Sequence, residues 1–107
     1  MVDISQIINC QVQNNSVIIF MNDKSQFAVT VPLCSIEVLL NQSKTIFYRI
    51  HNNTIINLQY LSRFTTNKRS YVLMTNGARY DVSHRRKKGL KDLITKQVKI
   101  NGKTKDT

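Results

Sequence analysis

The chain has 107 residues and is 41% hydrophobic, enough for one modest core in a single domain. No apolar run reaches the roughly 18 residues that cross a membrane. The first residues, 1–4, have neither the basic start nor the apolar stretch of a signal peptide. We therefore expect a cytoplasmic protein that makes no use of a membrane.

The formal net charge of +10 is distributed very unevenly along the chain. Residues 1–46 contain two basic and three acidic side chains, whereas residues 47–107 contain fourteen basic and three acidic ones. Such one-sided charge repels itself unless a polyanion binds it, and nucleic acid is the natural partner. An anionic membrane or an acidic protein would satisfy the same field, so charge alone leaves the partner open.

The first half of the chain predicts a short series of strands followed by one helix. Residues 7–12, 16–21 and 26–31 have strand-like patterns separated by polar turns, and 16–21 is apolar enough to be buried on both faces. Pro32 ends the third strand and opens a short amphipathic helix that reaches Leu40. The apolar face of this helix consists of Leu33, Ile36 and Leu40.

The second half repeats the strand pattern and ends in a basic helix. The expected strands are 46–50, 55–58, 61–66, 71–74 and 78–82. Asn76-Gly77 predicts a type I′ hairpin turn, because both residues tolerate positive φ. Ser83 is a suitable N-cap for a last helix whose apolar stripe is Leu90, Leu93 and Ile94. The domain is expected to span 1–96, and 97–107 to form a flexible basic tail.

Metal binding and catalysis receive little support from the sequence. Cys10 and Cys34 lie among apolar neighbours and are expected to be buried, reduced thiols. Together with His51 and His84 they lack the paired spacing of a zinc site. The acidic residues are scattered singly, so we expect no enzyme activity and no cofactor.

Two polar segments are candidates for function. Residues 47–58 place an arginine, a histidine and three asparagines at the end of a predicted strand pair, where they offer the donors and acceptors that DNA contacts need. Residues 82–88 lead a strand into a cation-rich helix start, where free N–H groups would bind phosphate. A hydrated asparagine-rich turn and a solvated basic face are the respective alternatives.

The first of these segments also resembles a family signature. Its Phe-Tyr-Arg-Ile-His-Asn-Asn-Thr-Ile-Ile-Asn-Leu string is similar to the aromatic-x-Arg-Ile-His…Asn-Leu motif of the LytTR DNA-binding domain family. Asn76-Gly77 followed by Val82-Ser83 resembles the family's ending. The resemblance extends over roughly residues 3–95 and includes the opening strand, the first loop and the short helix.

The resemblance implies an elongated, mainly β, antiparallel sandwich of short strands with a short internal helix and a basic C-terminal helix. Members insert loops into successive major grooves of double-stranded DNA, bind direct repeats as dimers, and usually form the output domain behind a receiver domain of a two-component response regulator. Carried over by position, the base contacts are Asn14, Asn15 and Ser16 of the first loop (residues 13–17), with Asn52 and His84. The phosphate contacts are Arg49, His51, Asn53, Ser83, Arg85, Arg86 and Lys87.

The chain departs from the family pattern in three places. Asn53 replaces the usual serine, and His84 replaces the usual arginine, so a bidentate guanine contact becomes a single, pH-sensitive one. The resemblance also leads us to expect a strand before Asp3, which we do not find in this sequence.

RNA and a membrane surface are the alternatives to DNA as the binding partner. An RNA-binding β module would use the basic face together with stacked aromatic rings, drawn from Tyr48, Tyr60, Phe64, Tyr71 and Tyr80. A membrane-surface role for the helix at 83–96 is disfavoured, because it lacks the Trp or Phe that interfacial helices use.

Overall fold

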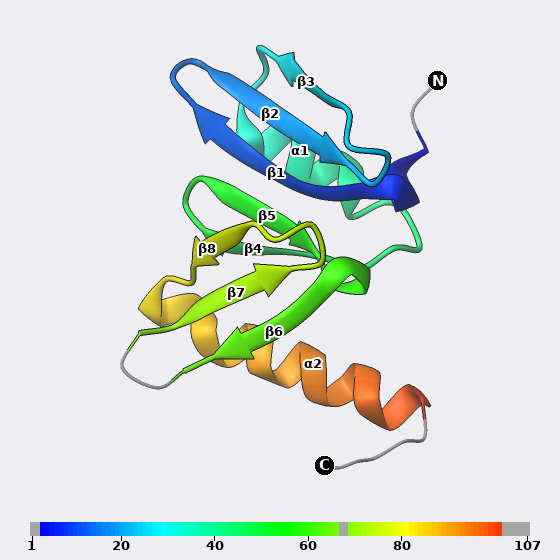
Figure 1. Cartoon of the computed structure of the whole chain (residues 1–107), viewed down its shortest axis with the longest axis vertical. Helices are drawn as coiled ribbons and strands as arrows, with labels where there is room; N and C mark the ends of the chain where they lie inside the picture. The colour runs from blue at the N-terminus through cyan, green and yellow to red at the C-terminus, as the bar shows by residue number, and fades with distance from the viewer. Residues whose placement is uncertain (1–2, 67–68, 102–107) are drawn as a thin grey trace.

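The computed structural model describes the chain over residues 3–66 and 69–101, and its side chains up to residue 96. Over these residues the chain forms two antiparallel sheets (Figure 1). The five-stranded sheet has the order β3-β2-β1-β5-β4, with bounds β1 Ile7–Gln13, β2 Ser16–Met21, β3 Gln26–Val29, β4 Phe47–His51 and β5 Thr54–Asn57. The three-stranded sheet has the order β6-β7-β8, with bounds β6 Leu61–Thr65, β7 Tyr71–Met74 and β8 Arg79–Asp81. The helices are α1 Leu33–Leu40 and α2 Lys87–Asn101, with 3-10 turns η1 Ile4–Gln6, η2 Leu58–Tyr60 and η3 His84–Arg86.

Each face of the five-stranded sheet is covered over part of its area, which divides the core in two. Helix α1 packs on one face, where Ile55 joins the cluster that contains Leu33 and Leu40. The three-stranded sheet and the start of α2 cover the other face, where Ile56 joins the cluster that contains Leu90. Consecutive strand residues point to opposite faces, so neighbours on β5 serve different cores. The molecule is elongated, with extents of 40 × 31 × 24 Å.

The structure confirms the mainly β class and all the strand positions to within about two residues. The short helix begins after Pro32 and buries Leu33, Ile36 and Leu40, as expected. The prediction that the second strand is buried on both faces was wrong. On β2 only Val17 and Ile19 are buried, because its other face is left partly open to solvent.

The hairpin at Asn76-Gly77 is present, but its turn is not type I′. Only Gly77 has a positive φ, at 89°, whereas a type I′ turn needs two such residues. Asn76 instead accepts a hydrogen bond from the backbone N–H of Ala78 at 3.0 Å through its side chain. The asparagine therefore stabilises the turn by a local side-chain contact rather than by a left-handed backbone.

The connection from β8 to the last helix also differs from the prediction. Ser83 caps the 3-10 turn η3 with no side-chain hydrogen bond, and α2 begins only at Lys87. The predicted stripe is present, with Leu90 buried and Leu93 and Ile94 half-buried. Helix α2 continues through 97–101, where a flexible tail was expected, and 102–107 lie outside the described residues. The boundary at residue 96 stays a prediction.

The two cysteines lie in different surroundings. Cys10 is buried in the core beneath α1, and burial raises the pKa of its thiol to about 12. Cys34 is exposed on α1, so the expectation that both thiols are buried was wrong. The apolar neighbours of Cys34 in sequence point to other faces of the helix, because helical side chains diverge by about 100° per residue.

Gly89 in the first turn of α2 allows the helix to approach β4 closely. The Tyr48 hydroxyl donates a hydrogen bond to the backbone carbonyl of Arg86 at 3.0 Å. A Cβ atom at Gly89 would overlap that hydroxyl group and the ring carbon that carries it. A glycine here is therefore a packing requirement of the contact between β4 and α2.

Gly89→Ala should destabilise the protein by about 1–3 kcal/mol, the usual cost of forcing an extra group into a packed site. Chemical denaturation measures the change, and Lys88→Ala at the exposed neighbouring position is the control. In a Tyr48→Phe background the cost of Gly89→Ala should fall, because the overlapping oxygen is gone. An equal cost in both backgrounds would contradict this explanation.

A thiol reagent at neutral pH should modify one cysteine in the native protein and both after unfolding. Exposed Cys34 reacts, whereas the buried thiol of Cys10 is shielded and stays protonated because of its raised pKa. Mass spectrometry of the labelled peptides identifies the modified residue. Rapid native labelling of Cys10 would show that the core opens more readily than the packing suggests.

Candidate nucleic-acid interface

Three polar connections lie next to one another along one edge of the molecule. They are the β1–β2 turn at Asn14-Asn15, the β4–β5 turn at Asn52-Asn53, and the segment 83–86 after β8; all lie on the left in Figure 1. We call these three connections the reading edge. Two backbone hydrogen bonds join them: Val12 N–H to the Asn53 carbonyl at 2.9 Å, and Ser83 N–H to the Ile50 carbonyl at 2.8 Å.

The β1–β2 and β4–β5 turns form one part of the reading edge. Asn14 has a left-handed backbone with φ of 55°, a conformation that asparagine tolerates, and it makes the turn tight. Asn14 and Asn15 are exposed and Ser16 is half-buried. Together with Asn52 they line one hollow, which also includes Arg49 and Cys34. The predicted base-contacting side chains of the two turns therefore share one surface.

Arg49 is engaged within the protein. Its Nη1 forms an ion pair with Glu37 at 3.1 Å, and its Nη2 donates to the backbone carbonyl of Asn52 at 2.6 Å. Its Nε is buried without a partner. The guanidinium thus fastens the β4–β5 turn to α1 and presents the exposed Asn52 side chain outward. Sequence reasoning missed this ion pair, although Glu37 is the only glutamate in the chain.

A second hollow lies between the β4–β5 turn and β8. It is lined by Gln11, His51, Asn53, Thr54, Arg79, Tyr80 and Asp81. The Nδ1 atom of His51 is buried and has no hydrogen-bond partner. Arg79 was not among the predicted contacts; its place on the polar face of an alternating strand was the available signal. The hollow combines a cation, an imidazole and an amide, which can bind phosphate oxygens, with the carboxylate of Asp81.

The cations after β8 are not equivalent. Arg85 and His84 are exposed, whereas Lys87 is half-buried at the start of α2. The Nη1 of Arg86 donates to the backbone carbonyl of Arg49 at 3.1 Å, so this side chain folds back onto β4. Arg85 is the arginine of this segment that extends into solvent. The half-buried Ser83 supplies its backbone N–H to β4.

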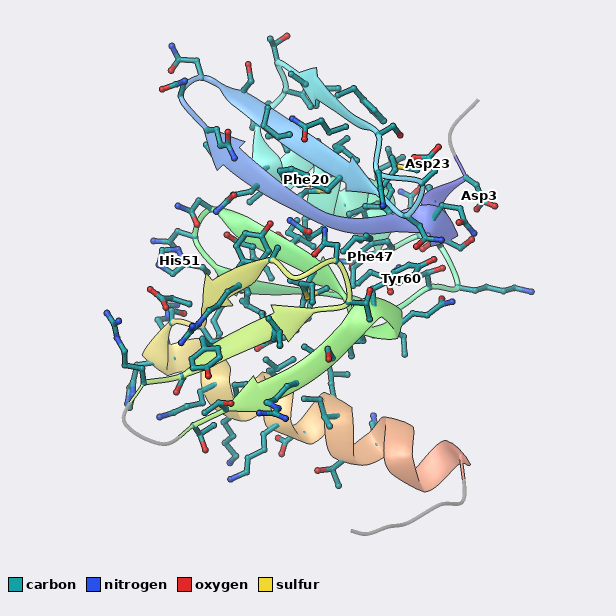
Figure 2. All side chains as sticks on the ribbon, in the orientation of Figure 1. Asp3, Phe20, Asp23, Phe47, His51 and Tyr60 are labelled. Carbon is teal, nitrogen blue, oxygen red and sulfur yellow. The ribbon has the colours of Figure 1, made fainter. Side chains whose placement is uncertain are left out.

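Charge is also separated in space. Figure 2 shows His51 at the reading edge and Asp3 and Asp23 at the opposite end of the molecule. Hydrogen bonds from Ser25 lower the pKa of Asp23, so that carboxylate remains charged. At the reading edge, Glu37 is neutralised by Arg49, and Asp81 lies beside Arg79. Two of the acidic side chains thus lie away from the reading edge, where they would not repel a polyanion bound there.

Some motif residues are structural rather than exposed. Asn57 is fully buried; its Nδ2 donates to the Ile7 carbonyl at 2.8 Å, and its Oδ1 accepts from the Gln59 N–H at 2.9 Å. It therefore joins the end of β5 to the start of β1 and caps η2. Buried Asn9 donates to the Tyr80 hydroxyl at 2.9 Å and links the two sheets. Burial raises the pKa of Tyr80, whereas the contact with Asn9 lowers it less.

Within the described part of the chain, no three His, Cys, Asp or Glu side chains are grouped as metal ligands would be. Over the same residues, no helix has both the length and the apolar character needed to span a membrane. The rings that could form a stacking platform mostly point inward: four of them pack against the core between the sheets, namely Tyr48, Tyr60, Phe64 and Tyr80.

A mainly β domain with polar turns aligned along one edge and a large excess of basic residues is typical of nucleic-acid-binding modules. The LytTr DNA-binding domain family matches residues 1–95, and the chain belongs to this family. It is a DNA-binding domain. A similar fold occurs in the LytTr DNA-binding domain of a Bacillus cereus protein described as a methyl-accepting/DNA response regulator. That structure has a TM-score of 0.74 and 21% identity, and covers 87% of this chain and 84% of its own. No curated protein matches the chain.

Asn57→Ala should lower the free energy of unfolding by about 1–3 kcal/mol, because it leaves the buried carbonyl of Ile7 without this partner and removes the cap of η2. Denaturant titration measures the loss. Folded Asn57→Ala protein should prefer the same DNA sequences as the unmodified chain, since Asn57 is not exposed. A changed preference with unchanged stability would contradict the structural role.

Proposed function

We propose that the chain binds double-stranded DNA sequence-specifically, with the turns of the reading edge inserted in successive major grooves. The observation that carries this proposal is the alignment of three polar connections, 14–15, 52–53 and 83–86, along one edge. Loops from different strands then meet one side of a duplex at fixed spacing. The net charge of +10 supplies the attraction for the phosphate backbone.

We assign base reading to exposed and half-buried side chains that carry donors and acceptors. An asparagine amide can pair with both exposed groups of adenine in the major groove, and a histidine can make a single bond to guanine. The proposed base contacts are Asn14, Asn15, Ser16, Asn52 and His84. The proposed phosphate contacts are Arg49, His51, Asn53, Ser83, Arg85, Arg86 and Lys87. Among the arginines, Arg85 is the exposed one, so it is the clearest backbone contact.

The family match also suggests a regulatory setting. We propose that the chain is the DNA-binding output domain of a cytoplasmic transcription regulator, with a receiver domain preceding it in the parent protein. Two copies would occupy direct repeats on the DNA. The Bacillus cereus protein, described as a response regulator, supports this setting by its similar fold.

Asn52→Ala should lower the ratio of specific to random-duplex affinity, because it removes an exposed amide at a turn tip. A lost base contact costs about 1–3 kcal/mol of discrimination. Arg85→Ala is the matched comparison: it should weaken binding to both duplexes alike and reduce the salt slope by about one. Selection of bound sites from a random duplex pool supplies the specific sequence, and fluorescence anisotropy measures both affinities.

If Asn52→Ala leaves the ratio unchanged, the assignment of base contacts is wrong. If the unmodified chain binds single-stranded RNA as tightly as its selected duplex, the alternative of an RNA-binding β module replaces the proposal.

A further inference from the structure

The three-stranded sheet has one face packed on the rest of the molecule and one face turned outward. On β7, Val72 and Met74 are buried in the core between the sheets. Tyr71 and Leu73 alternate with them and therefore belong to the outer face. In Figure 1 no described helix or strand lies over this outer face.

Two arginines flank Leu73 on the outer face. Strand pairing places Arg63 of β6 opposite Leu73, and Leu73 opposite Arg79 of β8. Residues directly opposite each other share a face, so the three form one line across the sheet, which we call the arginine row. Neighbouring strands lie about 4.8 Å apart, which puts the two arginine backbones roughly 10 Å from each other. Both arginines are exposed, whereas Leu73 is half-buried.

The charge of the row is not neutralised by a carboxylate. In the described part of the chain the salt bridge joins Arg49 to Glu37, and neither arginine of the row takes part in one. The Arg79 guanidinium lies 4.0 Å from the centre of the Tyr71 ring, which orients it without cancelling its charge. Asp81 lies one line further along, opposite Tyr71. The row therefore remains cationic, with one acidic neighbour at its side.

The row is continuous with the reading edge. Arg79 lines the same hollow as His51 and Asn53 of the β4–β5 turn. The Arg79 guanidinium already covers one face of the Tyr71 ring, so a nucleic-acid base cannot stack on that face. Charge without a free stacking platform suits a duplex backbone better than unstacked bases.

We propose that the arginine row is a second phosphate-binding surface, which holds the DNA backbone adjoining the segment that the turns read. This inference rests on the proposed function and deepens it. Arg63 and Arg79 each contact a phosphodiester, and neither reads a base. The row therefore adds affinity and salt dependence but no sequence preference, and it lengthens the stretch of duplex that one domain covers.

The test compares duplexes of two lengths with the full chain and with Arg63→Ala, Arg79→Ala and the double variant. One duplex contains only the selected site, and the other extends it by about 10 base pairs, one helical turn, on each side. On the longer duplex each substitution should reduce the slope of log affinity against log salt by about 0.9, and on the shorter one should change it little. The specific-to-random ratio should stay constant.

Matched variants separate this effect from general loss of charge. Lys44→Ala removes an exposed positive charge from the near-neutral N-terminal half and should leave both slopes unchanged. Arg79→Lys keeps the charge and should retain most of the slope. Asp81→Asn removes the acidic neighbour and should strengthen binding to the longer duplex. Circular dichroism confirms that each variant is folded.

The outcomes distinguish the inference from the proposed function. Unchanged slopes in the row variants, with specificity still lost in Asn52→Ala, would overturn the row and leave the function standing. Absence of duplex binding by the unmodified chain would overturn both. If the row variants lose more affinity for single-stranded RNA than for the longer duplex, the row binds RNA and the proposal is contradicted.

Discussion

The backbone of β4 at Arg49 and Ile50 is where the separate parts of the reading edge are joined. The carbonyl of Arg49 accepts from the Arg86 guanidinium, and the carbonyl of Ile50 accepts from the Ser83 N–H. From the other side, the Arg49 side chain connects α1 to the β4–β5 turn. Segments more than thirty positions apart in sequence are thereby held at fixed distances. A protein that reads several grooves needs this constraint, because flexible turns would have to be ordered on binding.

These contacts give several residues of the family motif a structural role. Its arginine is occupied by an ion pair and a turn carbonyl, and its last asparagine is buried beneath η2. The residues between them that are exposed at the turn are Asn52 and Asn53. Much of the motif thus supports the two exposed amides of the turn. Rigid support of this kind reduces the conformational entropy that a contacting side chain loses when it meets DNA.

Local patterns in the sequence were sufficient for the strands and for α1. Alternation along β8 and the stripe of Leu33, Ile36 and Leu40 each reflect a single element against a core, so neighbouring residues contain the information. The family resemblance then placed the candidate turns. The prediction failed where the outcome depends on tertiary contacts. Cys34 is exposed because α1 turns it away from the sheet, and Arg86 folds back because β4 offers it a carbonyl. Arg79 could not be chosen from the sequence, because it becomes a candidate contact only through its position beside the β4–β5 turn in the fold.

The Asn9–Tyr80 hydrogen bond has a consequence for how the two sheets are aligned. Apolar contacts have little directional preference. A purely apolar interface between two sheets therefore permits several relative positions of nearly equal energy. The hydrogen bond between buried Asn9 and half-buried Tyr80 favours one offset, because a shift of one sheet along the other would leave the buried Asn9 amide without its donor contact. Because β1 leads into one connection of the reading edge and β8 into another, this hydrogen bond also helps to fix the distance between those two connections.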